Sequence, residues 1–102
     1  MRNYIAIIRK DSNSDYGVDF PDFQGCISAG ATIEEAVTLG REALADHVAV
    51  MTEYGEEIPR PTDADTILSS LRNRDDLIAL FLAPVPDAKS KSVRVNISVP
   101  EA

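Results

Sequence analysis

Four carboxylates in the first half of the sequence have the side chains best suited to metal-dependent chemistry. Asp19 and Asp22 surround a proline turn, and Glu35 and Asp46 lie in a stretch with helical spacing. Carboxylate oxygens bind Mg²⁺, and bound Mg²⁺ supports phosphodiester cleavage. One hypothesis is therefore a small magnesium-dependent nuclease that uses Asp19, Asp22 and Glu35, although no spacing brings these side chains together.

The single histidine and the single cysteine indicate packing rather than nucleophilic catalysis. His47 occurs at helical spacing with apolar residues, which is typical of a histidine at the boundary of a core. Cys26 follows Gly25 in a strand-like segment and is typical of a small buried apolar residue. We find no Ser/Cys–His–Asp order and no second metal ligand at helical spacing. We therefore predict a protein that is not an enzyme and that needs no metal or cofactor.

The closing stretch, "SVRVNISVPEA", predicts contact with nucleic acid. Its apolar residues alternate with three polar ones, which are Arg94, Asn96 and Ser98. Paired strands can enter the major groove of DNA, where arginine suits guanine and asparagine suits adenine. A lone strand cannot bury its apolar side, so it requires a second copy and helices behind the pair. Pro100 and Glu101 are typical of the first turn of such a helix; the alternative is an edge strand of the main sheet.

The elements that precede this stretch predict a small α+β domain. A β-type run at Tyr4–Ile8 and an alternating run at Tyr16–Phe20 predict a hairpin across the polar residues 11–15. A short third strand follows at Cys26–Ala29, and Gly30 is expected to break it.

A capping box at Thr32 and Glu35 predicts the start of the longest helix. Gly40 on its apolar face would let the helix lie close to a sheet, at a cost of about 1 kcal/mol in helix propensity. Gly55 is the expected stop signal. The predicted apolar face consists of Ile33, Val37, Gly40, Leu44, His47, Val48 and Met51.

The second half of the sequence completes the predicted fold. A short helix is expected over Asp65–Leu71, with Asp63 or Asp65 near its cap, and Leu77–Leu82 is expected to be a central strand. The order β-β-β-α-(α)-β then gives a two-layer sandwich, with one long helix on a mostly antiparallel sheet. The proline- and lysine-containing stretch Ala83–Ser92 has the composition of a linker. The predicted organisation is a body at 1–84, a linker at 85–92 and a first strand of a DNA-binding module at 93–102.

The charge is unevenly distributed along the 102 residues, whose net charge is −7. Residues 1–87 carry 7 basic and 16 acidic residues, a net charge of −9, and residues 88–102 carry 3 basic residues and one acidic residue, a net charge of +2. An acidic body disfavours nucleic acid and favours a basic partner, whereas the basic end favours an anionic one. The alternative is a solvated acidic surface that simply aids solubility. The sequence lacks a signal peptide and any apolar run of membrane-spanning length, so a cytoplasmic protein is expected.

The loop "FPDFQGC" is the best candidate for a partner contact in the body. Two aromatic residues around a proline form a rigid turn, and aromatic residues in fixed loops are good anchors. We therefore predict that Asp19, Phe20, Asp22 and Phe23 contact a protein partner. The alternative is a purely structural connection between strands.

Most of the chain resembles the HicB family of antitoxins. The similarity rests on "YGVDFPDFQGC", "GATIEEAVTLGREALADHVAVM" and "GEEIP" between Tyr16 and Pro61, and the flanking strands fit as well. Gln24 is a departure, because many relatives carry proline there. The combination of these three segments is fairly specific, whereas each one alone is not.

This resemblance implies a function and a partner. The body would have a partial RNase H-like fold without an active site, and it would mask HicA, a small basic toxin that cleaves mRNA. A C-terminal ribbon-helix-helix or helix-turn-helix module would repress the operon as a dimer or tetramer. "KSVRVNISVPEA" is similar to the opening of a ribbon-helix-helix module whose helices are absent here, so we expect a truncated form. A scaffold or ligand-binding module with no toxin partner is a further alternative.

Overall fold

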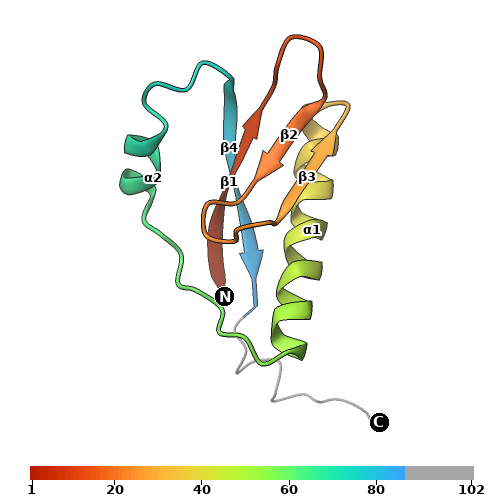
Figure 1. The fold of residues 1–102 in the computed structure, drawn as a ribbon, viewed down its shortest axis with the longest axis vertical. Coiled ribbons are helices and arrows are strands. Elements are labelled where there is room, and N and C mark those ends of the chain that lie inside the picture. The colour runs from red at the N-terminus through yellow and green to blue at the C-terminus, as the bar shows by residue number, and fades with distance from the viewer. Residues whose placement is uncertain (87–102) are drawn as a thin grey trace.

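The computed structural model describes residues 1–86 (Figure 1). The elements, in chain order, are β1 (Arg2–Arg9), β2 (Tyr16–Asp19), β3 (Ile27–Gly30), α1 (Ile33–Glu53), α2 (Ala64–Ser70) and β4 (Leu77–Val85). The predicted α+β class and the predicted order of elements are confirmed. Arg94, Asn96 and Ser98, with most of the predicted linker, lie outside the described residues.

The four strands form one antiparallel sheet in the order β3-β2-β1-β4. The prediction that Leu77–Leu82 is a central strand is wrong, because β1 is central and β4 lies at an edge. β4 is nevertheless apolar because packed side chains cover parts of both its faces. It also extends to Val85, which is 5% exposed, so residues 83–85 of the predicted linker belong to the sheet.

The main core lies between the sheet and α1. Tyr4, Ala6 and Ile8 alternate along β1 on this face, and they pack in one cluster with Val18 and Leu44. Gly40 permits this close packing, as predicted: a Cβ there would lie 2.9 Å from Phe81 Cζ and 3.0 Å from Val18 Cγ1. The predicted apolar face of the helix contains one wrong residue, because Ile33 is 39% exposed. Ala36, which was not part of that predicted face, is buried instead.

A second, smaller core lies on the opposite face of the sheet. Ile5 and Ile7 of β1 pack there against Ile67 and Leu71, which come from α2 and its C-cap. The predicted two-layer arrangement is therefore incomplete, because α2 partly covers the second face (Figure 1). α2 has 7 residues, compared with 21 in α1, so this cover is much shorter.

The ends of the elements follow the expected local chemistry. Thr32 Oγ1 accepts a hydrogen bond from Glu35 N at 3.0 Å, which confirms Thr32 as the N-cap of α1. The Glu35 carboxylate accepts from the N–H of Ala31 at 2.6 Å, one residue before the cap. Gly30 is the last residue of β3 rather than a break after it, so the third strand lies one residue later than predicted.

The stop of α1 and the cap of α2 also agree with the sequence. Gly55 follows Tyr54, the C-cap of α1. Its φ of +72° is a backbone conformation that favours glycine and ends the helix. Asp63 is the N-cap of α2 and accepts from Thr66 N at 3.2 Å. Among residues 1–86, neither helix has the length and apolar character needed to cross a membrane.

Candidate functional site

The aromatic residues of the loop between β2 and β3 belong to the core. Phe20 is 3% exposed and Phe23 is 2% exposed. Successive turns, with Phe23 N donating to Phe20 O and Cys26 N donating to Phe23 O, direct the chain back toward the sheet. Phe23 then packs edge-on against Tyr4, with ring centroids 4.7 Å apart. The prediction that Phe20 and Phe23 are exposed anchors for a partner is wrong, because the loop folds both rings inward.

The two carboxylates of the same predicted contact have separate structural partners. Asp19 Oδ1 lies 2.9 Å from Arg9 Nε across the β1–β2 hairpin. Asp22 accepts hydrogen bonds from the backbone N–H and the hydroxyl of Thr62, which ties this loop to the segment before α2. Both carboxylates are partly exposed, so a contact with a toxin stays a prediction for Asp19 and Asp22.

The carboxylates of the alternative magnesium-nuclease hypothesis do not come together in the described part of the chain. Asp19 pairs with Arg9, Asp22 with Thr62, and Glu35 with the backbone of Ala31, each at a different place in the fold. No group of three or more metal-binding side chains occurs among residues 1–86. The nuclease hypothesis therefore loses the geometry that it requires.

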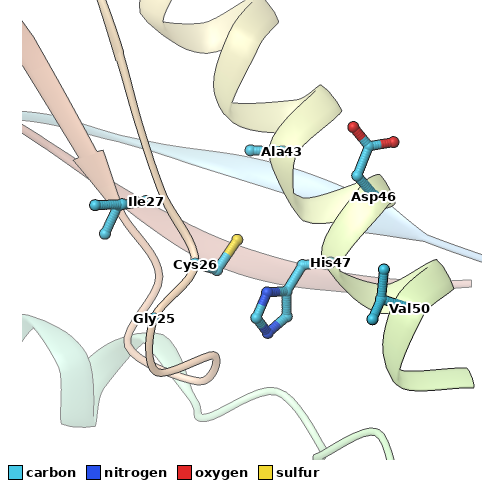
Figure 2. Close-up of a pocket in the computed structure, with 7 residues that line it drawn as sticks. All are labelled: Gly25, Cys26, Ile27, Ala43, Asp46, His47 and Val50. Atoms are coloured by element: carbon cyan, nitrogen blue, oxygen red, sulfur yellow. The ribbon is translucent and has the colours of Figure 1, made fainter. Parts of the chain in front are cut away.

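An open cleft lies beside this loop, between the start of β3 and the second half of α1. Its volume is about 390 Å³, and Figure 2 shows the loop on one side and the helix on the other. The lining residues are Gly25, Cys26, Ile27, Ala43, Asp46, His47 and Val50. Most of these side chains are apolar, and Asp46 is the lining residue with a carboxylate. The cleft is thus an apolar hollow with an acidic group beside it.

Cys26 and His47 help to form the inner part of this cleft. Cys26 is 4% exposed, and burial raises the pKa of its thiol, which confirms its character as a small apolar residue. His47 is partly buried, and its ring packs edge-on against Phe23 with centroids 5.9 Å apart. The predicted boundary histidine is confirmed.

Val50 is the exposed apolar side chain of α1 at the cleft, with 51% exposure. Ile27 is 68% exposed, but it pairs with Asp19, which pairs with Ile7, so its side chain lies on the opposite face of the sheet from α1 (Figure 2). Sequence reasoning missed the cleft because its walls come from two elements that only the tertiary fold brings together. One signal was available: Val50 is apolar but lies outside the predicted apolar face of the helix.

The charge of the described body is strongly negative. Residues 1–86 contain 7 basic and 15 acidic residues, a net charge of −8. On α1, five carboxylates accompany a single cation, Arg41. Arg41 Nη2 donates to the carbonyl of Leu82 at 3.0 Å, and this bond holds its charge over β4 rather than over the cleft. α1 therefore presents mainly negative charge on its exposed surface.

Comparison with known proteins relates the chain to bacterial toxin–antitoxin systems. The model of a family described as HicB_like antitoxin of bacterial toxin-antitoxin system matches residues 4–102. The crystal structure of the Burkholderia pseudomallei antitoxin HicB is similar with a TM-score of 0.75 and 30% identity, over 98% of this chain and 76% of that one. A chain in a structure titled HicA3 and HicB3 toxin-antitoxin complex is similar with a TM-score of 0.66 and 25% identity, over 83% of this chain and 99% of that one.

A curated protein of Haemophilus phage HP1 is also similar in sequence. This 14.9 kDa protein from the rep-hol intergenic region is 31% identical over 88 residues. The match covers 86% of the present chain and 66% of the phage protein, so the chain spans about two thirds of that relative's length.

Proposed function

This chain belongs to the HicB-like antitoxin family, and we propose that its folded body binds and masks a HicA-type toxin that cleaves mRNA. The masking would be steric and electrostatic. The acidic body would occupy the basic surface that the toxin uses for RNA, and it would compete there with the phosphates. The chain itself would have no catalytic role.

The observation that carries this proposal is the charge of the body. Its net charge of −8 over residues 1–86 gives a toxin with an RNA-binding surface a complementary partner. The similarity to a chain in a complex of HicA3 and HicB3 supports a HicA-type partner. The separate engagement of Asp19, Asp22 and Glu35 weighs against the rival nuclease.

A second role, repression of its own operon, belongs to the same proposal. Arg94, Asn96 and Ser98 would contact operator DNA as part of a complete ribbon-helix-helix module, in a dimer or tetramer. The body would have a partial RNase H-like fold, and the protein would act in the cytoplasm. Such a module needs two copies of this strand and the helices behind them, because one strand cannot form the paired ribbon on its own. Mobility-shift titration of the wild type and of an Arg94→Ala variant with operator DNA tests this role, and equal binding by the two would overturn it.

Titration of the full chain into a purified HicA-type toxin tests the masking proposal. We expect saturable binding that weakens as salt rises from 50 to 300 mM, since exposed charges are screened over about 10 Å at 0.1 M. The chain should also stop RNA cleavage by the toxin at about equimolar concentration. Absence of binding, or binding that leaves cleavage unchanged, would contradict the proposal and favour a toxin-independent scaffold. RNA degradation by the chain alone with Mg²⁺ would restore the nuclease hypothesis.

A further inference from the structure

The cleft between β3 and α1 has the features of a site for one long side chain. Two small residues, Gly25 and Ala43, lie where larger side chains would fill the space. Gly25 has a φ of +88°, and an added Cβ there would meet no atom within 4 Å. The hollow is therefore a consequence of the sequence and of the turn, and Val50 is exposed at its helix side.

The chemistry of the lining selects the kind of side chain. Ala43 and Val50 offer apolar contact to an aliphatic stem, and Asp46 offers a carboxylate at the helix side of the cleft (Figure 2). Lysine and arginine combine such a stem with a cationic head, and they bury the stem along apolar surface while the head finds a charged partner. Neither a purely apolar nor an acidic side chain would use both parts of the lining.

The surrounding charges favour the same occupant. Glu42 lies one turn before Asp46 on α1, and Glu53 lies about two turns after it, and both are exposed. The one cation of α1, Arg41, is held at the Leu82 carbonyl of β4. A cationic group that approaches the cleft along α1 therefore meets carboxylates of that helix.

We propose that this cleft receives a lysine or arginine side chain of the HicA-type toxin, with the stem between the Gly25 turn and Val50 and the cationic head at Asp46. This inference rests on the proposed function and adds to it the place of contact. It differs from the contact predicted at Phe20 and Phe23, because those rings are buried. In this proposal, the apolar lining and Asp46 bind the same side chain of the toxin, whereas the rest of the acidic surface contributes a less specific attraction.

A charge reversal with a matched control tests the electrostatic part. Asp46→Lys and Glu42→Lys make the same change of charge on exposed positions of one helix, but only Asp46 lines the cleft. Calorimetric titration of each full-length variant into the toxin should show about 30-fold or greater loss of affinity for Asp46→Lys, and about 3-fold or less for Glu42→Lys. Because both positions are exposed, the melting temperatures of the variants should match that of the wild type.

A second pair tests the apolar part. Val50→Ser removes the exposed apolar side chain of α1 that lines the cleft. Leu82→Ser removes an exposed apolar side chain of β4 on the other face of the sheet, where the exposed fraction is 54%. We expect Val50→Ser to lower the affinity for the toxin about 10-fold and Leu82→Ser to leave it unchanged.

The outcomes separate this inference from the proposed function. If the wild type binds the toxin and the two lysine variants lose affinity equally, the cleft has no special role and the inference is overturned. If the wild type binds and Leu82→Ser weakens binding more than Val50→Ser, the contact lies on the other face of the sheet, and the inference is again overturned. If the wild type does not bind at all, the proposed function fails.

Discussion

The two faces of the sheet are covered to very different extents. On one face, α1 runs over 21 residues and buries a continuous cluster that includes Tyr4, Val18 and Leu44. On the other face, the 7-residue α2 and its cap contribute Ile67 and Leu71 above Ile5 and Ile7. Leu68 of α2 is still 49% exposed, and Leu82 of β4 is 54% exposed. The stability of the body should therefore depend mainly on the α1 face.

This difference also bears on the proposed toxin contact. The cleft lies at the open end of the well-packed layer, between β3 and α1, so a rigid core supports its inner wall. A side chain that enters such a cleft meets lining residues that are already in place, which reduces the entropy cost of binding. The α2 face leaves Leu68 and Leu82 about half exposed, and its cover is short.

The largest expected effect on stability comes from shortening one buried side chain on each face of the sheet. Leu44→Ala, at a side chain that is 1% exposed, should lower the free energy of unfolding by about 3 to 5 kcal/mol, because it leaves a cavity in the larger core. Ile67→Ala should cost about 2 kcal/mol, since its partly exposed surroundings can relax into the space. Urea unfolding followed by circular dichroism gives both values. An equal or larger loss for Ile67→Ala would refute the difference between the faces.

A smaller effect is expected where α1 approaches the sheet most closely. Gly40→Ala should lower the free energy of unfolding by about 1 to 2 kcal/mol: the clash with Phe81 and Val18 exceeds the gain of about 1 kcal/mol in helix propensity. Phe81→Leu in the same chain removes the ring atom at 2.9 Å, so the double variant should lose less than the sum of the single changes. Thermal unfolding of the four proteins measures this coupling. A more stable Gly40→Ala variant would show that the packing of α1 is looser than the structure indicates.

The start of α1 should contribute about 1 kcal/mol through its cap. Thr32→Ala removes the oxygen that accepts from Glu35 N at 3.0 Å, and one backbone donor then loses its partner. Thr38→Ala is the control, because Thr38 is exposed within the same helix and alanine favours helix there. Denaturant midpoints of the two variants should fall on opposite sides of the wild type. Equal midpoints would mean that packing alone positions this end of α1.

Features that depend on neighbouring residues in the chain were predicted well from the sequence. Thr32 and Gly55 delimit α1 because capping and a positive φ are set by a few adjacent residues. The family was also identified from short segments of the chain, and the family comparison confirms it. The burial of Phe20 and Phe23 was missed because it depends on Tyr4 and on α1, which are distant in sequence.

The second covered face had a signal that the sequence interpretation did not use. All five residues of Tyr4–Ile8 are apolar, and all five are buried, so both faces of β1 are covered. A half-exposed strand would alternate polar and apolar residues instead. The edge position of β4 had no comparable signal in the sequence. Side chains packed on both faces of the sheet cover parts of β4, so this edge strand is as apolar as a central strand.

The smallest expected effect is a pH dependence confined to the α2 face. Hydrogen bonds from the Thr66 side chain and backbone hold the pKa of the Asp63 carboxyl below its usual value of 3.8. A carboxyl with a lowered pKa in the folded state stabilises fully above the unfolded value and loses that contribution as pH falls through the folded one. The wild type should therefore lose stability below about pH 4, and Asp63→Asn, which keeps a capping oxygen but does not titrate there, should lose less.

Thr66→Val sharpens this last test. It removes the side-chain donor that lies 2.7 Å from Asp63 Oδ1 but retains the backbone donor, so its pH dependence should fall between those of the wild type and Asp63→Asn. The Arg74–Asp76 pair also lowers a carboxyl pKa, but all three proteins share it, and the differences between them isolate Asp63. Urea midpoints measured between pH 6 and pH 2.5 give the comparison. Identical curves for the wild type and Asp63→Asn would show that α2 is held by Ile67 and Leu71 alone, with no measurable contribution from its charged cap.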